Sequence, residues 1–294
     1  MEQRRARVRR GAETVKGSSA SEVRRVPAAN GFAWLVQSLT LLRLQAARLL
    51  LIALLMQLVL GLTQLPLIGL LIVISVPGLG AGLLEAFHLT AQGRRPELRT
   101  LFRPLASGAH NGRLLAMGAL VFAIGVVSMS LLLSGSEELM DPAMVERIEQ
   151  GDLDAIAALN QGSLARMAMA FLVGVAVSGT LSYFAIPLIW FRGFKLGAAL
   201  ITGLRALIVN WLPFLVLSLG LALLFIPVAV FSGLAFGMVA SGGGMGAVVM
   251  ALIMILLLLF QLVLFGTQYC AFRDIFGVPG EAAQPPDDDT QLVV

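Results

Sequence analysis

Six long apolar runs alternate with shorter polar segments along the chain. The runs lie at about residues 49–65, 67–89, 114–134, 165–190, 212–236 and 246–270. Each is close to the ~20 residues that an α-helix needs to cross a bilayer. Because these runs are continuous, they differ from the strands of a membrane barrel, in which apolar and polar residues alternate. The pattern therefore predicts an all-α, polytopic membrane protein with six transmembrane helices.

Polar tails flank the predicted membrane domain of residues 29–277. Residues 1–28 are rich in arginine, and residues 278–294 contain the run Asp287 to Asp289. Both tails have too few apolar residues to build a core, so we expect them to be disordered. The basic start MEQRRARVRR is not followed by the apolar stretch of a signal peptide. A solvated acidic tail explains the three aspartates better than a metal site does.

The composition agrees with a chain that lies mostly in lipid. Of the 294 residues, 58% are hydrophobic and 13% are charged, whereas soluble domains carry about 25% charged residues. Nucleic-acid binding would need a folded basic face with stacking aromatics, and residues 1–28 contain no aromatic residue. We therefore predict membrane lipids as partners, exclude nucleic acid, and keep other membrane proteins as a further class of partner. A single cysteine, Cys270, excludes an internal disulfide.

The positive charges predict how the chain is threaded. Eighteen of the 21 Lys and Arg residues lie in residues 1–48, 91–113 and 191–211. The connections on the opposite side of the predicted spans contain only Arg147. Short loops rich in Lys and Arg stay in the cytoplasm. The asymmetry predicts a multi-pass protein of a bacterial inner membrane with both termini cytoplasmic.

Two pairs of segments indicate a weak internal repeat. Residues 82–93, GLLEAFHLTAQG, match residues 266–277, GTQYCAFRDIFG, and each stretch ends in glycine. Residues 33–50 match residues 198–215, which aligns Gln45 with Asn210. The matches predict two parallel repeats, formed by helix hairpins 1–2 and 5–6. An interfacial helix is expected before each hairpin, with Trp34 as one of its anchors at the membrane surface.

Glu85 and His88 stand at the end of the second apolar run and allow two interpretations. They can mark the place where the helix leaves the lipid, with a wetted Glu85 that meets His88 at i,i+3. They can also form a proton relay or ligand pair that faces a cytoplasmic vestibule. The first interpretation is favoured, because the matching segment carries an ordinary interfacial mixture of residues. Two further polar candidates, Gln57 and Gln261, fall near the middle of their spans, where an interhelical hydrogen bond is expected.

No catalytic pattern emerges from the sequence. It contains no GxSxG, HExxH, Walker or CxxC motif, and we predict no enzyme activity, cofactor or metal. The favoured function is a non-catalytic, lipid-contacting scaffold or accessory subunit. A small-molecule transporter or permease is the alternative, although ion-coupled carriers usually need charged residues at the middle of the bilayer.

Several stretches carry a resemblance to a known family: GFAWL, AGLLEAF, GRRPELRTLF, NWLPF and YCAFRDIF, within residues 31–277. Here the chain resembles a family of uncharacterised six-helix inner-membrane proteins of Proteobacteria, usually called hypothetical transmembrane proteins. It is also distantly similar to the membrane domain attached to some glycerophosphodiester phosphodiesterases, without their catalytic domain. The resemblance implies an integral inner-membrane protein, and it implies no activity and no site residues.

Overall fold

The computed structural model describes residues 23–108, 110–133, 142–150, 161–240 and 246–277, and these residues form helices and no strand. Six of the described helices are long and apolar enough to cross a membrane, which confirms the predicted fold class. These spans are Ala46–Gln64, Ile68–Ala91, Asn111–Ser130, Ala168–Arg192, Trp211–Gly233 and Val248–Phe276. The protein is therefore an integral membrane protein. The predicted disorder of residues 1–22 and 278–294 lies outside the described residues.

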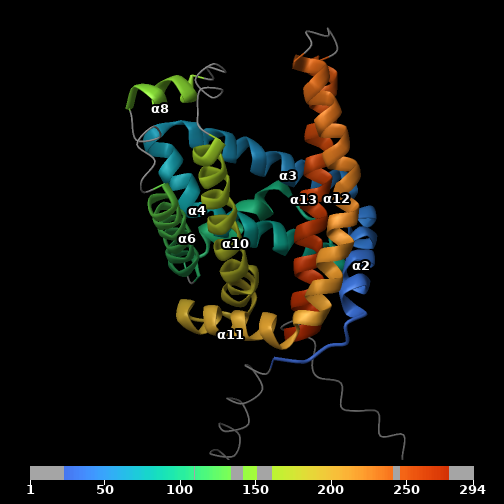
Figure 1. The fold of residues 1–294 in the computed structure, drawn as a ribbon. Helices are drawn as coiled ribbons and strands as arrows, with labels where there is room; N and C mark the ends of the chain where they lie inside the picture. Colours follow the sequence, from blue (N-terminus) through green and yellow to red (C-terminus); the bar gives the residue numbers. More distant parts are fainter. Residues whose placement is uncertain (1–22, 109, 134–141, 151–160, 241–245, 278–294) are drawn as a thin grey trace, which may run out of the picture.

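Figure 1 shows how the described helices are arranged. Their bounds are α2 Asn30–Leu44, α3 Ala46–Gly61, η1 Leu62–Gln64, α4 Pro66–Ala91, η2 Leu98–Phe102, α5 Arg103–Ala106, α6 Asn111–Leu133, α8 Pro142–Glu149, α10 Gln161–Arg192, α11 Leu196–Val209, α12 Trp211–Ala240 and α13 Gly246–Phe276. Many large apolar side chains on the spans remain exposed, among them Leu219 and Leu223 at 64% and 70%. Such surfaces are stable only against lipid, so these helices contact membrane lipids.

Three helices end in the same way at one end of the bundle. Gly93, Gly193 and Gly277 follow α4, α10 and α13 with φ of 70°, 64° and 72°, a backbone conformation that favours glycine. Arg192 Nη2 donates to the carbonyls of Phe276 and Gly277, so the ends of α10 and α13 are tied together. The terminal glycines of the two matched segments therefore both act as helix stops.

The matched helix junctions also share a local structure. Gln45 separates α2 from α3 with φ −139° and ψ 38°, and Asn210 separates α11 from α12 with φ −111° and ψ 31°. The helices before these junctions are placed differently. In Figure 1, α11 lies across the end of the bundle, as predicted for an interfacial helix, whereas α2 runs alongside α12 and α13.

Small side chains allow α2 to pack closely against α12 and α13. Gly31 lies against the backbone of Pro213 and Leu217, and the Ser38 hydroxyl donates to the Val263 carbonyl at 3.0 Å. Trp34 is fully buried, and its Nε1 donates to Asp274 Oδ2 at 2.7 Å. The prediction that Trp34 anchors at the membrane surface is therefore wrong, because the indole is fully buried inside the protein.

The segment after α4 folds back onto that helix. The Leu101 carbonyl packs directly on Gly82, and the Leu105 side chain packs on Gly78. Leu101 is fully buried, although it follows a stretch of exposed arginines. The glycines that follow Pro77 in α4 thus provide room for residues 98–106, while the helix itself continues through Pro77.

Candidate functional site

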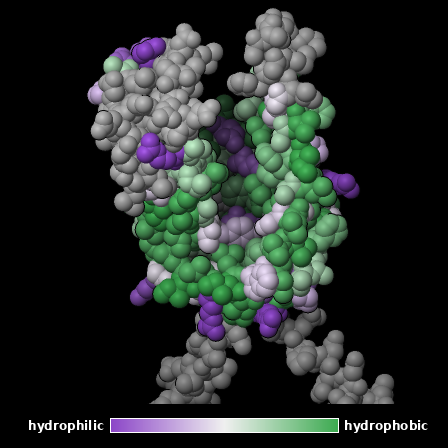
Figure 2. Space-filling view, in the orientation of Figure 1, coloured by the Kyte–Doolittle hydropathy of each residue, from purple (hydrophilic) through white to green (hydrophobic). Residues whose placement is uncertain are grey.

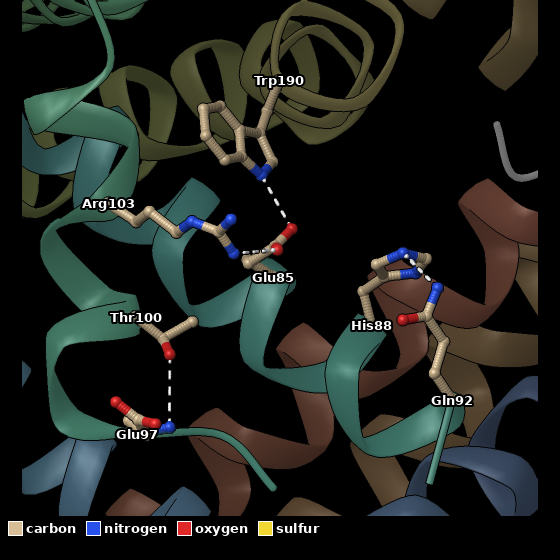
Figure 3. Close-up of polar contacts among 7 residues, drawn as sticks. All are labelled: Glu85, His88, Gln92, Glu97, Thr100, Arg103 and Trp190. Carbon is tan, nitrogen blue, oxygen red and sulfur yellow. Dashed lines mark hydrogen bonds and ion pairs between the residues drawn. The ribbon is translucent and has the colours of Figure 1, made fainter. Parts of the chain in front are cut away.

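Glu85 connects three separate parts of the chain near the end of α4 (Figure 3). Its Oε1 accepts a hydrogen bond from Arg103 Nη1 at 3.1 Å, and its Oε2 accepts one from Trp190 Nε1 at 3.1 Å. The Glu85 side chain is 12% exposed, whereas that of Arg103 is 59% exposed. A buried carboxylate needs such partners, because water cannot solvate it. Glu85 therefore links α4, the 98–106 segment and α10.

This geometry corrects the expectation of a wetted Glu85 paired with His88. His88 Nδ1 lies 3.2 Å from the Tyr269 hydroxyl, and Nε2 lies 2.9 Å from Gln92 Nε2. If the Gln92 amide donates to Nε2, the neutral ring carries its proton on Nδ1 and donates to Tyr269. Figure 3 shows the two side chains directed apart, Glu85 toward Arg103 and Trp190 and His88 toward Gln92.

His88 brings the two matched sequence segments into contact. It belongs to residues 82–93 and Tyr269 to residues 266–277, and their ring centroids are 5.9 Å apart. Phe191 of α10 packs on the same imidazole with a centroid distance of 5.3 Å. The histidine is thus half-buried between three helix ends, where it bridges α4 and α13.

The two glutamines at mid-span form the expected interhelical hydrogen bond. Gln57 Nε2 of α3 donates to Gln261 Oε1 of α13 at 2.6 Å. Gln261 Nε2 also lies 3.8 Å from the Met56 sulfur. The prediction that these side chains join two helices is confirmed.

A cavity of about 520 Å³ lies among the membrane-spanning helices. It is lined by residues of α3, α4, α10, α11, α12 and α13, and most of them are apolar, including Met56, Ile186, Leu217 and Phe265. Figure 2 shows a hollow between α10 and the α12–α13 pair, with apolar rims and some hydrophilic residues inside. No charged residue lines this cavity within the described part of the chain.

The few polar groups on the cavity wall are mostly satisfied by the protein. Gln268 Nε2 donates to the Tyr183 carbonyl at 2.5 Å, and the Thr267 hydroxyl donates to the Leu264 carbonyl at 2.8 Å. The Tyr183 hydroxyl is enclosed by the protein close to Thr267, so it does not open onto the cavity. The cavity therefore presents a mainly apolar surface.

The sequence analysis missed three residues of these sites: Arg103, Trp190 and Tyr183. Arg103 and Trp190 are distant from Glu85 in sequence, and the isolated Tyr183 in an apolar run gives no spacing signal. Groups of three or more His, Cys, Asp or Glu that could hold a metal are absent from the described residues. No family model, curated protein or solved structure matches the chain.

Proposed function

We propose that this protein is a non-catalytic, lipid-contacting protein that holds an amphipathic membrane molecule in the cavity between α10 and the α12–α13 pair. The observation that carries the proposal is an apolar cavity of about 520 Å³ that has no charged lining residue in the described part of the chain. An acyl chain matches the apolar wall of this cavity. A scaffold or accessory subunit would use such a molecule as a fixed part of its structure.

Transport of a small molecule is the second candidate. A cavity among membrane helices that include broken or proline-containing segments is a feature of many carriers, and Pro77, Pro187 and Pro227 lie inside three of the spans. The uncharged lining favours lipid binding instead, because coupling to protons or ions usually requires charged groups at such a site. Retention of a co-purified lipid separates the two candidates, since a transported solute would leave the cavity during purification.

Filling the cavity is expected to displace the bound molecule. A side chain added at Gly179 meets open space, and Gly179 lines the cavity. Gly179→Phe should therefore reduce the amount of lipid that remains bound in gentle detergent by about tenfold, the change that ~1.4 kcal/mol produces. Native mass spectrometry of the extracted protein measures this amount.

Two further variants make the cavity test specific. Gly233 in α12 also meets open space but is not a lining residue, so Gly233→Phe should leave the bound lipid unchanged. Tyr183→Phe should also leave the bound lipid unchanged, because the Tyr183 hydroxyl is enclosed by the protein and does not open onto the cavity. Equal retention in all three variants would contradict the proposal.

We also propose that the protein lies in a bacterial inner membrane with both termini in the cytoplasm. The distribution of Lys and Arg supports this orientation. The described parts of the two termini lie at the same end of the bundle, since the Arg24 amide donates to the Ile275 carbonyl at 3.2 Å.

Cysteine labelling of intact cells is expected to report the orientation. A cysteine at Asp152 should react with a membrane-impermeant reagent in intact cells, whereas cysteines at Ser18 and Gln284 should react only after permeabilisation. These three positions lie outside the described residues. The native Cys270 is fully buried and serves as the unreactive background. A cysteine at Asp152 that reacts only in permeabilised cells would reverse the orientation.

A further inference from the structure

A second hollow, beside the end of α4, is lined by arginine side chains. Its volume is about 600 Å³, and its wall contains Arg94, Arg95, Arg99 and Arg103 together with one acidic residue, Glu97. It shares no lining residue with the uncharged cavity between α10 and the α12–α13 pair. We call this hollow the arginine pocket.

The backbone around the arginine pocket is held in place by the fold. Gly93 turns the chain at the end of α4 with φ 70°, and Pro96 is buried. Glu97 and Thr100 form a capping box at the start of η2, in which the Thr100 hydroxyl accepts from the Glu97 amide at 3.2 Å (Figure 3). The burial of Leu101 on Gly82 then fixes η2 against α4. The arginines therefore project from a structured turn, which reduces the entropy lost when a ligand binds.

The charge on the arginine pocket is only partly balanced within the protein. Arg99 pairs with Glu97, and Arg103 uses Nη1 to bind Glu85 while its side chain stays 59% exposed. Arg94 and Arg95 are exposed and form no ion pair with other described residues. Guanidinium groups bind phosphate oxygens through paired hydrogen bonds. The pocket thus has the charge and the donors to bind a phosphate group.

An apolar edge beside the arginine pocket indicates where the phosphate comes from. Leu98 and Phe102 are 49% and 38% exposed, and both flank the pocket arginines along the chain. An adjoining hollow of about 410 Å³ is lined by Arg48, Leu51 and Leu98, and Leu51 on α3 is 53% exposed. Basic residues next to exposed apolar side chains are typical of surfaces that contact anionic lipid.

We propose that the arginine pocket binds the phosphate of an anionic phospholipid, whose acyl chains extend along Leu51, Leu98 and Phe102. The headgroup is recognised by the four arginines, and the apolar edge distinguishes a lipid from a soluble phosphate compound. Glu85 positions Arg103 for this contact. The site goes beyond the proposed lipid cavity, because it selects the charge of the headgroup and lies in a separate part of the molecule.

The test uses the full chain in nanodiscs of phosphatidylcholine, into which phosphatidylglycerol is titrated and its binding measured by native mass spectrometry. The variant is Arg94→Gln/Arg95→Gln, which leaves the Glu85–Arg103 pair intact. It should weaken phosphatidylglycerol binding by about tenfold or more, given ~1 kcal/mol for each arginine near a membrane surface. The exposed Arg205 of α11, which does not line the pocket, supplies the control Arg205→Gln; it should change binding by at most about fivefold, the effect of a single surface arginine.

Three further measurements decide between the possible ligands. Leu98→Gln/Phe102→Gln should weaken phosphatidylglycerol binding and leave glycerol 3-phosphate binding unchanged. Glycerol 3-phosphate that binds as tightly as the lipid and depends on the same arginines would overturn the lipid assignment in favour of a soluble phosphate compound. Equal binding of phosphatidylcholine and phosphatidylglycerol would overturn the headgroup contact itself. Because the cavity between α10 and the α12–α13 pair has no charged lining residue, Gly179→Phe should leave the preference for phosphatidylglycerol over phosphatidylcholine unchanged, and this preference tests the arginine pocket independently of the cavity proposal.

Discussion

Arg103→Gln is expected to lower the free energy of unfolding by about 2–3 kcal/mol, because it leaves the Glu85 carboxylate buried with Trp190 as its remaining partner. Removal of one partner from a buried ion pair typically costs ~3–5 kcal/mol. The expected loss is smaller here because Arg103 is 59% exposed and its charge is partly screened by solvent. Unfolding in mixed micelles of a zwitterionic detergent measures this loss without a contribution from anionic lipid.

A double-mutant cycle shows whether the Glu85–Arg103 pair itself carries the effect. Glu85→Gln keeps a neutral acceptor for Trp190, so Glu85→Gln/Arg103→Gln should be more stable than Arg103→Gln alone, with a coupling above ~1 kcal/mol. Arg99→Gln is the matched control, since the Arg99–Glu97 pair is 86% and 56% exposed and such pairs contribute at most ~1 kcal/mol. Equal losses for Arg99→Gln and Arg103→Gln would mean that Glu85 does not depend on its ion pair.

The sequence predicts the spans and their ends because few backbone conformations satisfy their hydrogen bonds in lipid. An apolar run of about 20 residues must form a helix to satisfy its backbone hydrogen bonds in lipid, and the glycines after α4 and α13 are the residues that best stop such a helix. The Gln57–Gln261 bond was predictable for a related reason. An amide in the middle of a span gains a partner when it faces another helix rather than lipid.

The partners of Glu85 could not be predicted from local spacing. Periodicity along one helix pairs Glu85 with His88, whereas the carboxylate is bound by Arg103 from the next segment and by Trp190, 105 positions away. The bend that returns residues 98–106 to α4 depends on Gly82, and its significance is visible only when Leu101 is seen packed against it. Arginines in a loop between two spans otherwise indicate only the orientation of the chain.

The position of α2 shows a second limit of the apolar pattern. Phe32 and Val36 are 59% and 47% exposed, whereas Leu35 and Leu42 on the same helix are buried against other helices. Lipid and protein interior are both apolar, so hydrophobicity cannot tell which of them covers a helix face. Small residues at Gly31 and Ser38 are the better signal, because they allow α12 and α13 to approach closely.

Gly82→Ala is expected to cost about 2–3 kcal/mol of stability, although alanine normally favours a helix over glycine. A methyl group at this position would overlap the backbone carbonyl of Leu101, which cannot rotate away as a side chain could. Overpacking of this kind costs ~1–3 kcal/mol, and the buried Leu101 would lose part of its contact with α4 as well. Unfolding of the variant in mixed micelles provides the measurement.

Gly125 in α6 supplies the control for this substitution, because a methyl group there meets no atom within 4 Å. Gly125→Ala should therefore show the intrinsic preference of a helix for alanine and raise stability by up to ~1 kcal/mol. The two substitutions are chemically identical, so a difference in sign between them isolates the contact of Leu101 with Gly82. Because this contact holds η2 in place, Gly82→Ala should also weaken phosphatidylglycerol binding while every pocket arginine remains present. Equal stability of Gly82→Ala and Gly125→Ala would mean that residues 98–106 do not pack on α4. The arginine pocket would then not be held rigid by the contact between Leu101 and Gly82.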